Sequence, residues 1–140
     1  MSEFKTESPE ETEEAGMELV RKYGPKRIFC LFGPLAAGKT TLVKGMAKEL
    51  GVKRTIVSPS YVLLRQYEGE FPLFHLDLFR IQSGEEFIEA GLDEYLLEPE
   101  GTVALEWAGR IENILPDNRV DVTLELTEDE KRIIRTRLVT

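Results

Sequence analysis

Eight consecutive residues, Gly33 to Thr40, have types and a spacing that suit the binding of a triphosphate. They read Gly-Pro-Leu-Ala-Ala-Gly-Lys-Thr, which fits the pattern G-x-x-x-x-G-K-[ST] of a phosphate-binding loop. In such a loop glycines let main-chain N–H groups approach phosphate oxygens, the lysine reaches the β- and γ-phosphates, and the hydroxyl ligates Mg²⁺. The residues expected to contact the nucleotide here are Gly33, Ala36, Ala37, Gly38, Lys39, Thr40 and Thr41.

An acidic side chain, Asp77, lies in a run from Phe74 to Arg80 that alternates apolar and polar residues. The alternation predicts a strand with His75, Asp77 and Phe79 on one face. A carboxylate at the end of a strand beside a phosphate loop can hold Mg²⁺ directly or through water. An ion pair between Asp77 and Arg80 explains the same residues equally well. We interpret His75, the single histidine, as a structural residue rather than a base.

A second acid, Glu106, follows the apolar residues 103–105 and precedes Trp107. A carboxylate at such a strand end can orient the attacking water or bind Mg²⁺. Trp107 suits stacking on a nucleotide or on a partner and, equally, packing under a loop. The candidate catalytic residues are therefore Lys39, Asp77 and Glu106, and the candidate metal ligands are Thr40, Asp77 and Glu106.

Three further hydroxyl groups have a functional and a structural interpretation. Thr41 lies near the expected α-phosphate, but helix capping explains it equally well. Ser58 and Ser60 flank Pro59 in a predicted loop that could contact Mg²⁺ and the γ-phosphate as a switch. A Ser-Pro-Ser sequence is more often only a turn.

These candidate residues depend on predicted strands and helices to bring them together. An apolar strand over residues 28–32 leads into the loop, and a helix follows from Lys39 to Leu50, where Gly51 ends it. An earlier helix begins with Ser8 as its cap. The remaining predictions are a hairpin of residues 62–67 and 71–79, an acidic helical stretch over 84–97 interrupted by Gly91, and a hairpin of residues 119–126 and 133–139 at a sheet edge.

The chain length and composition predict one domain that spans residues 1–140. It has 140 residues, of which 41% are hydrophobic, and this permits a core of ordinary size. No apolar run approaches the roughly 20 residues that cross a bilayer, and the N-terminus lacks signal-peptide features, so we expect a soluble, cytoplasmic protein. The single cysteine, Cys30, lies within the predicted strand before the loop and suits a buried apolar role.

The charge is both negative overall and unevenly distributed. A net charge of -8 argues against a protein that holds nucleic acid by itself, because such binding requires Lys and Arg to neutralise phosphates. Basic residues dominate positions 26–54, whereas positions 85–106 carry acids and no base. Two solvated faces explain this distribution at least as well as a basic side for polyphosphate or RNA and an acidic side for a protein partner.

Five sequence elements occur together in one order along the chain. They are the loop Gly33 to Thr41, Ser58-Pro59-Ser60-Tyr61, His75-Leu76-Asp77-Leu78-Phe79-Arg80, Gly91 to Tyr95, and Glu106-Trp107. This set resembles the TsaE (YjeE) family, small bacterial ATPases that assist in making the threonylcarbamoyladenosine modification of tRNA. The resemblance extends over almost the whole chain and is far more specific than the loop alone.

The resemblance implies a fold, cofactors and residue roles. The fold would be a P-loop α/β domain with three layers, a mainly parallel central sheet and antiparallel edge strands. The cofactors would be ATP and Mg²⁺. By analogy Lys39 and Thr40 bind phosphate and Mg²⁺, Asp77 supports the metal, Glu106 assists hydrolysis, and Trp107 lies beside the nucleotide.

The resemblance also implies partners. These are the two related subunits of the threonylcarbamoyl-transferase complex, of the TsaD and TsaB types, and the ATPase would reset that complex between turnovers. Contact with tRNA would be indirect, through the complex, and no membrane is involved.

The chain departs from the family pattern within the loop. Pro34 stands where the family usually has an acid, and Ala36 replaces a glycine and adds a methyl group at a point of close approach to phosphate. Because Gly38, Lys39 and Thr40 are kept, we expect nucleotide binding with altered loop geometry, affinity or turnover.

Two other functions fit a phosphate loop. A small-molecule kinase needs a mobile lid with arginines, for which we consider Arg110 and Arg119, after the acidic stretch, as the candidates. The chain leaves little room for such a lid. A nucleotide-gated interaction module that barely hydrolyses ATP is the second alternative.

Overall fold

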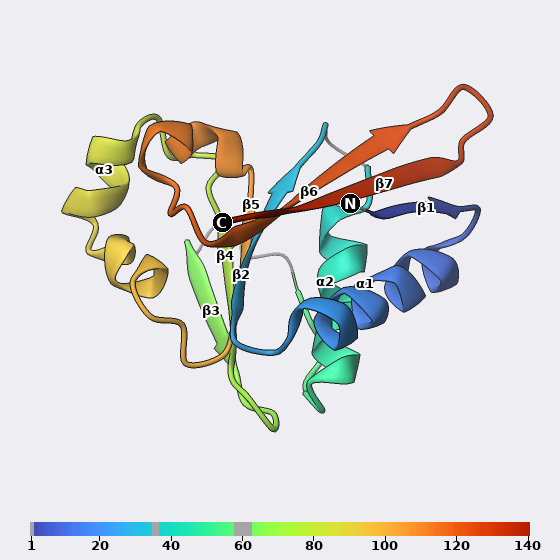
Figure 1. Ribbon diagram of the computed structural model, residues 1–140, viewed down its shortest axis with the longest axis horizontal. Coiled ribbons are helices and arrows are strands. Elements are labelled where there is room, and N and C mark those ends of the chain that lie inside the picture. The colour runs from blue at the N-terminus through green and yellow to red at the C-terminus, as the bar shows by residue number, and fades with distance from the viewer. Residues whose placement is uncertain (1, 35–36, 58–62) are drawn as a thin grey trace.

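The computed structural model describes residues 2–34, 37–57 and 63–140, and within them the strands form one seven-stranded sheet (Figure 1). The strands are β1 (Ser2–Thr6), β2 (Arg27–Phe32), β3 (Leu64–Tyr67), β4 (Leu73–Asp77), β5 (Thr102–Glu106), β6 (Arg119–Leu126) and β7 (Arg132–Val139). The helices are α1 (Pro9–Tyr23), α2 (Lys39–Glu49), α3 (Gly84–Glu89) and the 3-10 helices η1 (Leu92–Leu96) and η2 (Ala108–Ile114). None of the described helices is long and apolar enough to cross a membrane.

The centre of the sheet is parallel and its margins are antiparallel. The strand order is β1-β7-β6-β2-β5-β4-β3. Strands β6, β2, β5 and β4 pair in parallel, whereas β3, β7 and β1 pair antiparallel with their neighbours. This arrangement confirms the predicted mainly parallel sheet with antiparallel strands at both sides.

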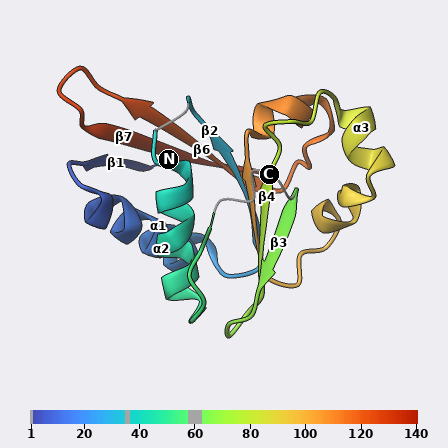
Figure 2. The same cartoon turned by 180° about the vertical axis from the view of Figure 1, so that it is seen from behind.

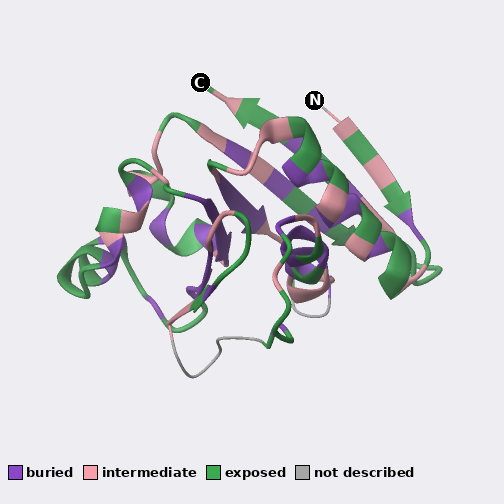
Figure 3. Ribbon diagram, turned by 90° about the horizontal axis from the view of Figure 1, so that it is seen from below, coloured by how far each residue is buried: buried purple, intermediate pink, exposed green. Residues whose placement is uncertain are grey.

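Helices cover the sheet on both faces, which completes three layers (Figures 1 and 2). Alternate residues of β2 face opposite layers: Phe29 and Leu31 pack with α1 and α2, while Ile28 and Cys30 pack toward α3, η1 and η2. Cys30 is fully buried, as expected, and this burial raises the pKa of its thiol to about 12. Figure 3 shows central strands in purple along their length, and every residue of β4 and β5 is buried, so side chains on both faces of the sheet are covered there.

The N-terminal residues form a strand that the sequence analysis did not predict. Strand β1 pairs with β7, from Ser2 opposite Thr136 to Thr6 opposite Arg132. The predicted C-terminal hairpin forms and extends the sheet beyond β2, but β1, and not a strand of the hairpin, takes the edge. An edge strand is half-exposed, so its polar residues resemble an unstructured tail in the sequence.

Most predicted elements form within a few residues of their expected bounds. Helix α1 begins with the Ser8 side chain accepting the N–H of Glu11 at 3.2 Å, as the capping pattern predicts. The acidic stretch is interrupted at Gly91, as predicted: this residue has a φ of 77° and separates α3 from η1. Ile88, an apolar position of that stretch, is 46% exposed.

Helices α1 and α2 pack so closely that glycine is required where they touch. A Cβ at Gly45 would lie 1.8 Å from the backbone oxygen of Glu13, and a Cβ at Gly16 would lie 2.2 Å from that of Leu42. Both glycines lie within regular helix and need no special backbone conformation. It is their lack of a side chain that lets α2 pack this closely against α1.

We expect Gly45→Ala to lower the free energy of unfolding by about 3 kcal/mol, because the methyl group forces the helices apart. Chemical denaturation measures this loss. Gly109→Ala is the matched control, since the nearest atom to its new Cβ is 4.0 Å away. Equal effects of the two substitutions would contradict the packing described.

Candidate functional site

The predicted site residues meet at the carboxyl ends of three parallel strands. The phosphate loop connects β2 to α2, and the register pairs Leu31 of β2 with Glu106 of β5 and Glu106 with Asp77 of β4. Parallel strands end at the same edge of a sheet, which is where open α/β sheets bind their ligands. The structure therefore brings the loop, Asp77 and Glu106 together, as the sequence analysis expected.

The described part of the loop has a backbone that favours glycine. Gly33 and Gly38 have φ values of 153° and 100°. A Cβ at Gly33 would also lie 2.7 Å from the backbone oxygen of Leu124, so β6 restricts the loop. Gly38 is the N-cap of α2, whose own first turn contains no acid, and the positive end of the helix dipole faces the loop.

Lys39 is folded back into the loop. Its Nζ donates hydrogen bonds to the backbone oxygens of Gly33, at 2.5 Å, and Pro34, at 2.9 Å. The residue is only 5% exposed, and this burial lowers the pKa of its ammonium group, although the carboxylates of Glu106 and Asp77 oppose the shift. The loop thus holds a desolvated cation beside two acids, at the point where a phosphate group would supply negative charge.

The carboxylate of Glu106, at the end of β5, connects α2 to the neighbouring strand β4. Thr40 Oγ1 donates to Glu106 Oε2 at 3.0 Å and lies 3.2 Å from Oε1. His75 Nε2 lies 2.5 Å from Glu106 Oε2. Glu106 is 4% exposed, so this buried acid has partners on both α2 and β4.

His75 is the residue whose position the sequence analysis missed. It was interpreted as structural, but its imidazole contacts the candidate catalytic carboxylate directly. The available signal was the two-residue spacing between His75 and Asp77, which puts both on the face where β5 carries Glu106. Which strand lies beside β4 could not be read from that spacing.

Asp77 completes a set of oxygen atoms around the loop. Its Oδ1 accepts the backbone N–H of Phe79 at 3.0 Å, and the residue is 7% exposed. The oxygens of Thr40, Asp77 and Glu106 suit Mg²⁺, which prefers oxygen ligands and is usually held by one or two carboxylates together with water and substrate phosphates. The described residues contain no cluster of three or more His, Cys, Asp or Glu that could hold a metal ion alone.

Trp107 has a strained backbone and lies beside the loop lysine. Its φ and ψ are 60° and 40°, a conformation that costs a bulky residue about 1–3 kcal/mol. Lys39 Nζ lies 4.0 Å from the centre of its ring, and the ring of Phe79 lies 5.0 Å away on centres. The guanidinium of Arg110 also lies near, 5.8 Å from the Trp107 ring. Trp107 therefore belongs to the surroundings of the phosphate loop and is not only a packing residue under a distant loop.

The remaining predicted nucleotide-binding and switch residues are only partly described by the structure. Gly38, not Thr41, is the N-cap of α2, and this excludes the capping role considered for Thr41. The backbone N–H of Ala37 donates to the backbone oxygen of Pro34 at 3.3 Å, and the side chain of Ala37 is buried. Three predicted residues lie outside the described part of the chain, namely Ala36, Ser58 and Ser60.

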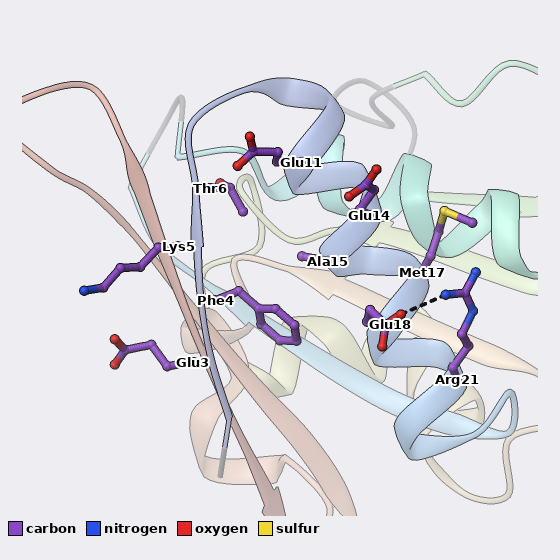
Figure 4. Close-up of a pocket in the computed structure, with 10 residues that line it drawn as sticks. All are labelled: Glu3, Phe4, Lys5, Thr6, Glu11, Glu14, Ala15, Met17, Glu18 and Arg21. Carbon is purple, nitrogen blue, oxygen red and sulfur yellow. Dashed lines mark hydrogen bonds and ion pairs between the residues drawn. The ribbon is translucent and has the colours of Figure 1, made fainter.

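A groove of about 780 Å³ lies apart from the loop, between β1 and α1 (Figure 4). Its lining includes the apolar side chains of Phe4 and Met17 together with four carboxylates and two cations, namely Glu3, Glu11, Glu14, Glu18, Lys5 and Arg21. Acids outnumber bases in this lining, which disfavours a polyphosphate, and the groove shares no residue with the phosphate loop. We therefore exclude it from the candidate site.

A family model, curated relatives and a solved structure are all similar to this chain. Residues 6–134 match the family model "Threonylcarbamoyl adenosine biosynthesis protein TsaE". The TsaE protein of Bacillus subtilis is 36% identical over 94% of this chain and 82% of its own length, and that of Treponema pallidum is 35% identical over 91% of this chain and 93% of its own. The crystal structure of Bacillus subtilis YdiB superposes with a TM-score of 0.81 at 33% identity, covering 99% of this chain and 86% of YdiB.

The buried charge of Lys39 should cost stability in the absence of a ligand. Because folding lowers its pKa, the unfolded chain binds the proton more tightly, and stability rises with pH between the folded pKa and the ordinary value of 10.5. We expect Lys39→Met to raise the free energy of unfolding at pH 7 by about 1 kcal/mol, and the gain to shrink as the pH approaches 10.5.

Thermal unfolding at pH 7 and at pH 10 measures this difference, with Lys44→Met, on the exposed face of the same helix, as the control. A Lys39→Met protein that is less stable than the wild type at pH 7 would contradict the claim that the buried charge of Lys39 lowers stability.

Proposed function

The chain belongs to the TsaE family of threonylcarbamoyl adenosine biosynthesis proteins, and from this premise we propose that it is an Mg²⁺-dependent ATPase serving the threonylcarbamoyladenosine modification of tRNA. It would act as an accessory subunit, hydrolysing ATP weakly alone and more rapidly with its partners. The P-loop fold shared with YdiB supports nucleotide binding.

The observation that carries the proposal is the hydrogen bond from Thr40 to Glu106. It joins the hydroxyl that ligates Mg²⁺ in phosphate loops to the acid at the end of β5. A carboxylate at this position is a potential metal ligand and proton acceptor beside the phosphate loop. A carboxylate so placed can accept the proton of an attacking water and direct that water to the γ-phosphate.

The protein's contribution to hydrolysis would be positioning and charge. Lys39 and the N-terminal end of α2 would stabilise negative charge on the β- and γ-phosphates. Thr40, Asp77 and Glu106 would hold Mg²⁺, which supplies further charge neutralisation when bound. Glu106 would orient the attacking water, and the ring of Trp107 would shield Lys39 from solvent on one side.

Partner subunits of the TsaD and TsaB types would use this activity. ATP hydrolysis would reset the transfer complex between turnovers, and the tRNA would contact this chain only indirectly, since a net charge of -8 disfavours direct binding. The acidic segment supports a protein-binding role, because Ile88 and Leu97 are 46% and 76% exposed within it.

The kinase alternative gains no support from the arginines that it requires. Arg119 Nε is paired with Asp121 Oδ1 at 2.8 Å, at the start of β6. Of these two arginines, Arg110 lies near the loop, where it rests against the rings of Phe79 and Trp107, and the side chain of Arg132 lies beside Gly38.

We expect Lys39→Ala to weaken ATP binding and turnover by about 100-fold, since it removes the cation that faces the phosphates. Calorimetric titration and ATP turnover measure the two effects, and Lys44→Ala should match the wild type. Unchanged ATP binding by the Lys39→Ala protein would refute the loop as the nucleotide site.

A second prediction separates the ATPase from an interaction module. Glu106→Ala should abolish multiple-turnover threonylcarbamoylation of tRNA by the reconstituted partner subunits while ATP binding persists. If modification continues at the wild-type rate, the chain acts by binding ATP and not by hydrolysing it. If the wild-type chain fails to stimulate modification at all, the proposed biological role is wrong.

A further inference from the structure

Glu106 is a buried carboxylate held by two donors on different elements. Thr40, on α2, reaches both of its oxygens, whereas His75, on β4, contacts only Oε2. Oε2 therefore has two partners, and Oε1 has one longer contact at 3.2 Å. The less engaged oxygen is the one available for a water molecule or a metal ion.

The surroundings of His75 fix where its proton lies. The residue is 0% exposed, and its Nδ1 has no hydrogen-bond partner among the described residues. Its Nε2, in contrast, faces a carboxylate oxygen at 2.5 Å. Because a carboxylate accepts hydrogen bonds, Nε2 carries a hydrogen and donates it to Glu106.

Arg65 lies directly opposite His75 in the antiparallel pair of β3 and β4. Opposed residues of such a pair share a face of the sheet, with Cβ atoms about 5 Å apart. Arg65 Nε is also buried without a partner among the described residues. An arginine offers only N–H donors, so it matches an imidazole whose Nδ1 is left as an acceptor. This neighbour favours the same tautomer.

We propose that His75 is a positioning residue for Glu106, a role that rests on the proposed function of Glu106 in ATP hydrolysis. Its Nε2–H holds Oε2 and prevents rotation of the carboxylate, so that Oε1 stays directed to the reacting water. Residues that orient a ligating or catalytic group in this way typically change activity 10–100-fold when they are lost. A buried polar side chain of purely structural use would affect stability alone.

Two amide substitutions test the position of the donor. The side-chain nitrogen of His75→Gln lies near where Nε2 lies, whereas that of His75→Asn lies nearer Nδ1 and cannot reach Glu106. Both variants are neutral and polar, which makes each the control for the other. ATP turnover should be measured with the partner subunits present, together with KM for ATP and the melting temperature of each variant.

We expect His75→Asn to lower kcat about 10-fold or more with KM within about 3-fold, and His75→Gln to restore most of kcat. Equal kcat values for the two variants, after correction for the folded fraction, would overturn the positioning role. So would a loss that appears only in KM or only in stability.

Nitrogen-15 NMR of the wild-type chain gives a second test that does not require activity. The protein has one histidine, so the imidazole signals need no assignment. We expect a hydrogen on Nε2 that exchanges slowly with solvent. A signal from the Nδ1–H tautomer would overturn the inference.

Glu106→Gln separates this inference from the proposed function. If Glu106→Gln keeps wild-type turnover, the ATPase mechanism itself fails. If Glu106→Gln loses turnover but His75→Asn keeps it, the mechanism stands and the role of His75 is refuted.

Discussion

The hydrogen bond between Thr40 and Glu106 joins two parts of the chain that are 66 residues apart, the first turn of α2 and the last residue of β5. It can form only because β2 and β5 are parallel neighbours in a register that pairs Leu31 with Glu106. The loop that follows β2 then begins beside the acid that ends β5. Moving β5 by one residue would turn Glu106 to the opposite face of the sheet and away from α2.

The same strand register brings buried charges and a strained backbone together at the carboxyl ends of the parallel strands. Lys39, Asp77 and Glu106 are each less than 8% exposed, and Trp107 has a left-handed backbone conformation. Buried charges and backbone strain persist only where the surrounding structure is firm. The close contact of α1 with α2 and the fully buried strands β4 and β5 provide that support. The packing of these elements therefore holds Lys39, Asp77 and Glu106 in place.

Much of this could be predicted from the sequence because its signals are local. Glycines, the lysine and the threonine of the loop have fixed spacing, and apolar periodicity identified the main strands and helices. The neighbours of β4 and β6 depend on long-range pairing, which periodicity does not report. This is why the contact of His75 with Glu106 and the edge position of β1 emerged only from the structure. The family resemblance supplied the role of Glu106 but not the partners that hold its carboxylate.

The most direct measurement is a crystal structure of the chain with Mg²⁺ and a non-hydrolysable ATP analogue. The account predicts the β- and γ-phosphates within the loop against Lys39 Nζ, Thr40 Oγ1 on the metal ion, and Glu106 facing the γ-phosphate while still bonded to His75. A triphosphate bound outside the loop, or a Glu106 carboxylate turned away from the γ-phosphate, would contradict it.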